Sequence, residues 1–249
     1  ALGGVVHRFV GNDDIAEMHR MIDVATQEFV VIAGDVVDGG AALGLAQDFA
    51  HDVGVRLRPV AMEDASFIVW LRNLNHARGR VGDSATDTAA QQAWLKEYFA
   101  REGDYYFIIE TSRGIPVGAY GIYDLKGNSA ESGRWIVRPE ALAAIPSAIL
   151  AFEIAFEKLR LRELRVKTVS TNTNVLSLYR KLGFTQTTVE AGERIIGGKP
   201  VDLVHFLLEA KDWPKIREKF VPLARLAEKQ IVEWEEAELQ RTKAEPRKI

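Results

Sequence analysis

The segment from Lys167 to Phe184 holds the side chains that are best placed to do chemistry. A strand-like run is followed by the amides of Asn172 and Asn174, and a short helical pattern then carries Tyr179. A phenol has an ordinary pKa of about 10, so it is protonated at neutral pH and can donate a proton. A strand that ends in amides and leads into a helix with a phenol predicts a polar cleft at one end of a sheet.

A sheet that could hold this cleft is predicted by the alternation of strand and helix patterns through the middle of the chain. The order is strand, two helices, three strands, helix, strand, helix and two strands. This order predicts an α/β (α+β) fold, with a mixed, mostly antiparallel sheet flanked by helices. The strands are expected at residues 56–59, 105–109, 116–122, 132–137, 164–169, 184–189 and 200–208, and the helices at 88–99, at 147–159, from Glu63 onward and around Tyr179.

Composition excludes several classes of function. The 249 residues are 47% apolar and 27% charged, as in ordinary soluble globular proteins. The net charge of -3 gives no general attraction to nucleic acid or to an anionic membrane. No apolar run approaches the ~20 residues of a membrane span, and the absence of cysteine excludes disulfides and a cysteine nucleophile. Because no signal-peptide pattern opens the chain, we expect a cytoplasmic protein.

The chain divides into three segments. Residues 1–54 predict an α/β extension of open role, with a helix from Gly39 through Phe49; residues 55–209 form the central domain, and residues 210–249 a helical tail. Leu223, Ile231 and Trp234 recur in the tail at helical spacing. The tail therefore either packs on the sheet or pairs with a second copy in a homodimer.

Asn174, Tyr179 and the ending Leu182-Gly183-Phe184, on this order of elements, resemble the GNAT superfamily of N-acetyltransferases. The resemblance implies a sheet that is splayed open after its fourth strand and an acetyl-CoA cofactor whose thioester arm lies in the opening. It also implies that Asn174 bonds the pantetheine arm, although asparagine is equally suited to begin a helix. Tyr179 would protonate the leaving sulfur as general acid, and Gly183 is expected to end the helix as a left-handed cap.

The rest of the implied cofactor site lies at the end of the fourth strand. Backbone N–H groups near Ile136 and Val137 would polarise the thioester carbonyl. The family's phosphate loop carries Arg or Gln, two residues, Gly, any residue, then Gly or Ala, but residues 138–147 contain no glycine. The motif aligns either with Arg138, Ala141 and Ala143 or with a loop at 143–147. We favour the second, with Pro146 and Ser147 starting the helix, whereas a plain strand-to-helix connection is the alternative. The expected cofactor residues in this loop are Ala143, Ala144, Ser147 and Ala148.

A base must take the proton of an attacking amine. Glu131, at the head of the fourth strand, is the first candidate, because related enzymes often use a carboxylate there. His76 is the second, because a neutral imidazole suits base work near pH 7. An exposed strand-start glutamate and a solvent-exposed loop histidine are the structural alternatives for the two residues.

The acceptor is expected to be a small-molecule amine. Basic and amide side chains precede the second helix and could hold a diphosphate, and Trp70 or Trp94 could stack on a base or sugar, although Trp94 also fits a core position. Together with the strand patterns, these residues resemble the sugar-nucleotide N-acetyltransferases of the pseudaminic-acid pathway type. A protein N-terminal acetyltransferase and a catalytically silent CoA-binding regulator are the alternatives. The expected substrate-binding residues are Arg72, Asn73, Arg78 and Arg80.

Overall fold

The computed structural model describes residues 49–50, 53–74, 77, 85 and 87–244. Within them the strands form one sheet in the order β1-β2-β3-β4-β5-β6-β8-β7. All neighbours are antiparallel except β5 and β6, so the predicted mixed, mostly antiparallel sheet is confirmed. The strands are β1 (Phe49–Ala50), β2 (Val55–Pro59), β3 (Tyr105–Thr111), β4 (Pro116–Lys126), β5 (Ser129–Val137), β6 (Glu163–Val169), β7 (Thr185–Ile196) and β8 (Lys199–Glu209).

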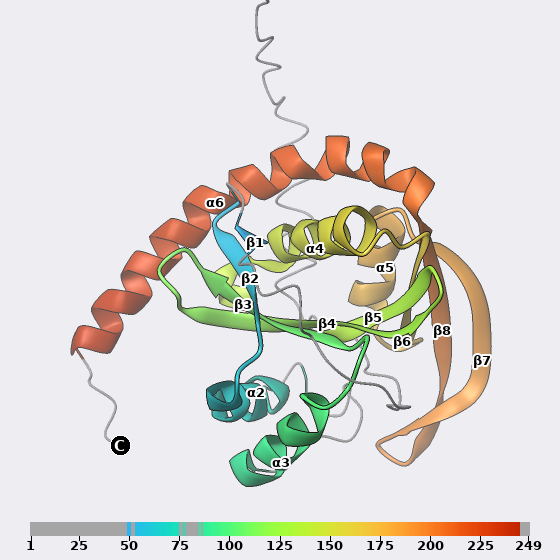
Figure 1. The fold of residues 1–249 in the computed structure, drawn as a ribbon, viewed down its shortest axis with the longest axis horizontal. Coiled ribbons are helices and arrows are strands. Elements are labelled where there is room, and N and C mark those ends of the chain that lie inside the picture. The colour runs from blue at the N-terminus through green and yellow to red at the C-terminus, as the bar shows by residue number, and fades with distance from the viewer. Residues whose placement is uncertain (1–48, 51–52, 75–76, 78–84, 86, 245–249) are drawn as a thin grey trace, which may run out of the picture.

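Helices cover both faces of this sheet (Figure 1). One face carries α2 and α3, and the other carries α4 and α5, with the long α6 crossing outside α4. No helix of the described part of the chain is long and apolar enough to cross a membrane. The helices are α2 (Ala65–Arg72), α3 (Thr88–Tyr98), α4 (Ala144–Glu153), α5 (Thr173–Lys181) and α6 (Trp213–Ala244), with a π-helical turn at Ile154–Lys158 and 3-10 turns at Met62–Asp64, Pro139–Ala141 and Ala210–Asp212.

The sheet splits between β5 and β6. These two strands pair only from Ser129–Glu131 to Glu163–Arg165. Beyond that point β5 stays paired with β4 as far as Val137, and β6 stays paired with β8 as far as Val169. The two strands therefore diverge after Glu131, which confirms the predicted splay after the strand that precedes α4.

A β-bulge lies in β5 just beyond the start of the split. Ala119 faces Ile136 and Gly121 faces Gly133, so Tyr120 opposes two residues of β5. Gly118 is required beside the bulge, because a Cβ there would lie 2.5 Å from the Ile136 carbonyl oxygen. The bulge bends β5 at the point where it leaves β6.

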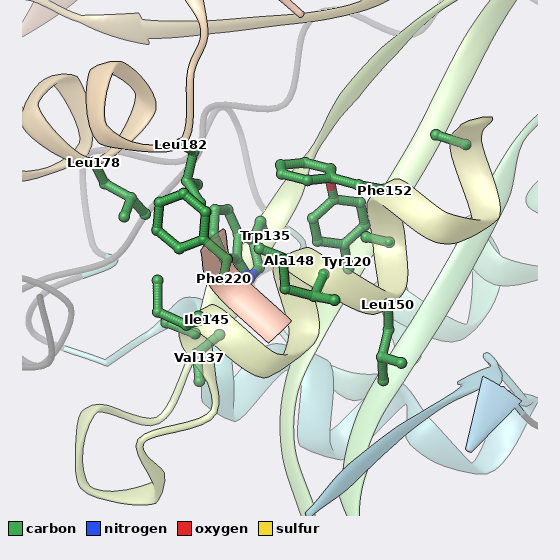
Figure 2. Packing of buried hydrophobic residues seen from close by; sticks show 14 of the residues in the cluster. Tyr120, Trp135, Val137, Ile145, Ala148, Leu150, Phe152, Leu178, Leu182 and Phe220 are labelled. Carbon is green, nitrogen blue, oxygen red and sulfur yellow. The ribbon is translucent and has the colours of Figure 1, made fainter. Parts of the chain in front are cut away.

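The main core fills the space between the sheet, α4, α5 and α6. Figure 2 shows Phe220 of α6 with Leu178 of α5 and with Leu182, which directly follows α5, and aromatic residues from the sheet and α4 lie nearby. Leu223 and Ile231 are also buried in this cluster. The tail therefore packs on the body of its own chain, which is the first of the two roles expected for it.

Three local predictions were wrong. Phe49 was expected to end a helix, but it lies in β1 and pairs with Leu57, because a sheet edge can recruit a short extended segment regardless of local pattern. Helix α4 was expected to start at Pro146 and Ser147 but begins at Ala144. Asn174 does not begin α5, since Asn172 occupies the cap position. The remainder of the predicted extension, residues 1–48 and 51–52, lies outside the described residues.

Candidate active site

Tyr179 is buried under the split in the sheet, with 1% of its surface exposed. Its ring packs 5.2 Å from that of Phe184 and 5.5 Å from that of Phe206, measured between centroids. Burial raises the pKa of the phenol well above its ordinary value, and nearby Tyr120, Tyr123 and Glu131 act in the same direction. Tyr179 is thus held as a neutral proton donor across the physiological range.

The Tyr179 hydroxyl makes no hydrogen bond in the described structure. Leaving a buried hydroxyl without a partner costs about 1–3 kcal/mol. The hydroxyl of the nearby Tyr120, by contrast, has a partner, because it accepts a hydrogen bond from Ser132. A ligand atom that accepts from Tyr179 would remove this penalty, and so the hydroxyl marks a place for such an atom.

Glu131 lies where β5 and β6 separate, and its carboxylate is held from both sides of the split. Tyr123 of β4 donates its hydroxyl to one oxygen at 3.0 Å, and Lys167 of β6 donates to the other at 3.1 Å. The carboxylate keeps a partly exposed surface, because its side chain is 14% exposed. Glu131 is thus an ordered acceptor that a substrate proton could still reach.

The sequence does not reveal the two partners of Glu131. Tyr123 on β4 is paired with Glu131 on β5. On β6, Glu131 is paired with Arg165, and Lys167 lies two residues further along that strand. Side chains at i and i+2 of a strand share a face, so register brings all three to one face of the sheet. Register depends on contacts between distant segments, which local patterns do not contain.

The N–H of Val137 points into the split. Arg138 donates its backbone N–H to the Val117 carbonyl of β4 at 2.7 Å. Because successive N–H groups of a strand point to opposite edges, the N–H of Val137 faces the side that β6 has left, whereas that of Ile136 faces β4. Of the two expected carbonyl-polarising positions, this alternation favours Val137.

The connection from β5 to α4 contains a 3-10 turn and leads directly into a buried helix. Leu142 adopts a left-handed conformation with φ of 53°, and α4 then begins at Ala144 with all ten residues buried. Pro146 removes one of the N–H groups that a helix N-terminus offers to an anion. Ala143 and Ala148 are also buried, so small side chains replace the missing glycines.

Ser147 is already engaged by the protein. Its hydroxyl donates to the Ala144 carbonyl at 3.0 Å and accepts from the Trp135 indole at 3.2 Å. Its backbone N–H donates to the Ala143 carbonyl at 3.0 Å. These bonds favour a packing role for Ser147 over the expected contact with phosphate.

Arg138, the basic residue of the first loop alignment, is already paired, because its guanidinium donates to the Glu140 carboxylate of the same loop at 2.8 Å. Its guanidinium carbon lies 5.3 Å from the ring centroid of Trp70 and 4.8 Å from that of Trp234. It also bonds to the Glu238 carboxylate of α6 at 3.3 Å. Arg138 therefore joins α2 and α6 to the end of β5.

Asn174 is half-buried in the first turn of α5, the helix that follows β6. The preceding Asn172 is buried and donates its side-chain amide to the Thr168 hydroxyl at 3.3 Å. The two amides therefore have different surroundings. A bond from Asn174 to a pantetheine arm stays a proposal.

The expected acceptor residues are only partly described. Arg72 ends α2, where burial lowers its pKa; Tyr106 opposes this shift and Arg134 adds to it. Asn73 is exposed and donates its side-chain amide to the Val69 carbonyl at 2.8 Å. His76, Arg78 and Arg80 lie outside the described residues.

Comparison with known proteins supports the fold and the family. Residues 55–185 match the family model described as an acetyltransferase (GNAT) domain. Among solved structures, the apo form of FdhC, described as a nucleotide-linked sugar GNAT, is 27% identical, with a TM-score of 0.57 over 69% of this chain and 94% of that chain.

A spermidine N-acetyltransferase from Vibrio cholerae in complex with CoA and spermine is 17% identical, with a TM-score of 0.60 over 65% of this chain and 98% of that chain. At this identity the likeness concerns the fold alone. Among curated protein sequences there is no significant match. Because the family model spans more than half of the chain, the protein belongs to the GNAT acetyltransferase family.

Proposed function

We propose that this GNAT acetyltransferase transfers the acetyl group of acetyl-CoA directly to the amine of a nucleotide-linked amino sugar. The acetyltransferase activity and the cofactor follow from the family. The observation that carries the mechanism is the unpartnered, buried hydroxyl of Tyr179 beside the held carboxylate of Glu131. A proposed general acid, Tyr179, and a proposed general base, Glu131, thus lie near the same split in the sheet.

The residues of the split fit the reactive end of acetyl-CoA, which supplies an acetyl group activated as a thioester. Tyr179 offers a donor without a partner, and the Val137 N–H faces an open strand edge. The diphosphate end fits less well, because no glycine opens the loop and Pro146 lacks an N–H. We infer that the grip on the cofactor relies on the pantetheine side, with Asn174 among its ligands.

Each residue then has one task. Glu131, oriented by Tyr123 and Lys167, accepts a proton from the acceptor amine. The N–H of Val137 stabilises the charge that develops on the carbonyl oxygen. Tyr179 donates its proton to the sulfur that leaves. His76 remains the alternative base, since nothing in the described structure bears on it.

A nucleotide-linked sugar is favoured over other amines by two observations. FdhC, the nucleotide-linked sugar GNAT, is more similar in sequence than the spermidine enzyme. Arg72, the one expected substrate-binding arginine within the described residues, ends α2 beside the ring of Tyr106. Positive charge next to an aromatic ring suits a diphosphate with an attached base and disfavours a polycationic amine.

The acceptor is tested by measuring thiol release from acetyl-CoA with three amines: a UDP-linked 4-amino sugar, spermidine and a peptide with a free N-terminus. The chain has no cysteine, so released CoA is the only thiol in the assay. We expect the highest kcat/KM with the sugar nucleotide. A higher value with spermidine or the peptide would overturn this acceptor class.

The altered phosphate loop favours a second candidate function, that of a catalytically silent regulator that binds CoA. A protein that binds CoA in calorimetry, yet acetylates none of these amines, would be the catalytically silent regulator instead. The buried start of α4 and Pro146 are the features that favour it.

A further inference from the structure

The bulge of β5 is built around a buried arginine. Arg134 is 3% exposed and has a φ of 52°, in the left-handed region that non-glycine residues seldom adopt. It pairs with both oxygens of the Asp104 carboxylate, one of these bonds measuring 2.8 Å. Asp104 precedes β3, so the pair ties the bulge to a different strand.

Aromatic rings enclose the same guanidinium. Its carbon lies 4.4 Å from the ring centroid of Tyr123, 5.2 Å from Trp94 and 5.3 Å from Tyr106. These rings come from β4, α3 and β3. Desolvated cation–π contacts and a bidentate carboxylate are among the stronger interactions of an arginine. The side chain thus connects the bulge to three neighbouring elements.

The backbone at this position would suit glycine better. A left-handed conformation is sterically unfavourable for a residue that carries a Cβ. Gly121, across the bulge, makes room for the arginine, because a Cβ there would lie 3.1 Å from the Arg134 Cδ. An arginine in such a conformation is consistent with a side chain that anchors the bulge.

The anchored bulge lies between the two groups that the proposed transfer needs from β5. Glu131 precedes it and Val137 follows it on the same strand. Tyr123, whose ring contacts the Arg134 guanidinium, donates its hydroxyl to Glu131. We infer that Arg134 is a positioning residue that sets the separation and orientation of the Glu131 carboxylate and the Val137 N–H; this inference rests on the proposed function.

The test removes the anchor without forbidding the backbone conformation. Arg134→Gly retains access to the left-handed region, and Asp104→Asn in the same variant avoids a buried unpaired charge that could prevent folding. Arg160→Gly is the matched control, because Arg160 is exposed and has a φ of 53°. Arg134→Lys is the conservative variant, keeping the charge but losing the bidentate geometry.

All variants are assayed on whichever amine the wild-type protein acetylates best. For the double variant we expect kcat to fall about 100-fold, since a misplacement of about 1 Å costs this much. The CoA dissociation constant from calorimetry should stay unchanged, so that the loss falls on kcat and not on cofactor binding. Arg134→Lys should recover part of kcat.

A kcat of the double variant that matches that of Arg160→Gly would overturn the positioning role. Acetylation of spermidine alone by the wild-type protein would overturn the proposed acceptor and still allow the Arg134 comparison. A wild-type protein that acetylates none of the three amines would overturn both the proposed function and the role inferred for Arg134.

Discussion

At the scale of single residues, the active-site hypothesis depends on a hydroxyl that the fold buries without a partner. Tyr179 could be replaced by phenylalanine with no loss of packing, because its ring already lies against Phe184 and Phe206. A chain under selection for stability alone has no reason to keep the oxygen there. The presence of the oxygen is consistent with a function that requires a donor.

Tyr179→Phe separates these roles. Removing an unsatisfied buried hydroxyl should leave the melting temperature unchanged or raise it. Loss of the general acid should lower kcat by about 100-fold to 10,000-fold. Thermal unfolding and steady-state kinetics measure the two effects. A lower melting temperature together with unchanged kcat would assign Tyr179 to packing and remove it from the mechanism.

The pH dependence of the wild-type protein gives a second check on Tyr179. The phenol must be protonated to donate, and its pKa is raised by burial, first of all, and then by Tyr120, Tyr123 and Glu131. Deprotonation is therefore displaced to higher pH than for a free tyrosine, about 10. We expect kcat to show no fall on the alkaline side below this pH, measured with saturating acetyl-CoA. An alkaline fall near neutral pH that disappears in Tyr179→Phe would contradict the raised pKa of this phenol.

At the scale of elements, the loop from β5 to α4 is where this chain departs from its family pattern. Helix α4 starts with alanines and a proline in place of glycines, so fewer N–H groups point toward its N-terminal end. The departure is confined to the diphosphate end, since the split between β5 and β6 keeps the expected form. We therefore expect cofactor affinity to be limited by this loop.

Pro146→Ala should strengthen CoA binding, because it restores an N–H in the first turn of α4. One additional hydrogen bond to a charged group contributes about 1.5–3 kcal/mol, so the dissociation constant from calorimetry should fall roughly tenfold or more. Pro222→Ala, an exposed proline within α6, is the matched control and should leave it unchanged. Equal affinities of the wild type and Pro146→Ala would show that α4 does not contact the diphosphate.

The elements also show how much could be predicted from the sequence. Apolar periodicity predicted the order of strands and helices, because this order depends on local pattern, and the family resemblance implied the splay after the fourth strand. The partners Tyr123 and Lys167 could not be predicted, since register joins segments far apart in the chain. Arg134 was hidden for another reason: an arginine within a strand pattern indicates extended backbone, whereas here it is left-handed.

At the scale of the whole molecule, α6 contacts both the end of α4 and the turn between β3 and β4. At its start the Trp213 indole donates to Glu157, just after α4, at 2.7 Å. Near its end Glu235 accepts from the backbone N–H of Arg113, in the β3–β4 turn, at 2.8 Å. Between these points its apolar face closes the main core. The helix is therefore an integral part of the folded body.

Phe220→Ala should cost about 3–5 kcal/mol of unfolding free energy, because the ring is 1% exposed and its loss leaves a cavity. Phe99→Ala is the matched control, since that ring is 43% exposed, and we expect a much smaller effect. Urea denaturation of both variants gives the comparison. Equal destabilisation by the two substitutions would mean that α6 does not close the core.

The short pairing of β5 with β6 has a mechanical consequence. Within the described residues, strand pairing joins the block β1–β5 to the block formed by β6, β8 and β7 through three residue pairs of β5 and β6. The sheet thus has a seam, and shear between its two blocks would be resisted there by few backbone bonds. A ligand that pairs with the open edge of β5 would extend the ladder across this seam. Binding of such a ligand would then also hold the two blocks together, and the sheet would become stiffer when the cleft is occupied.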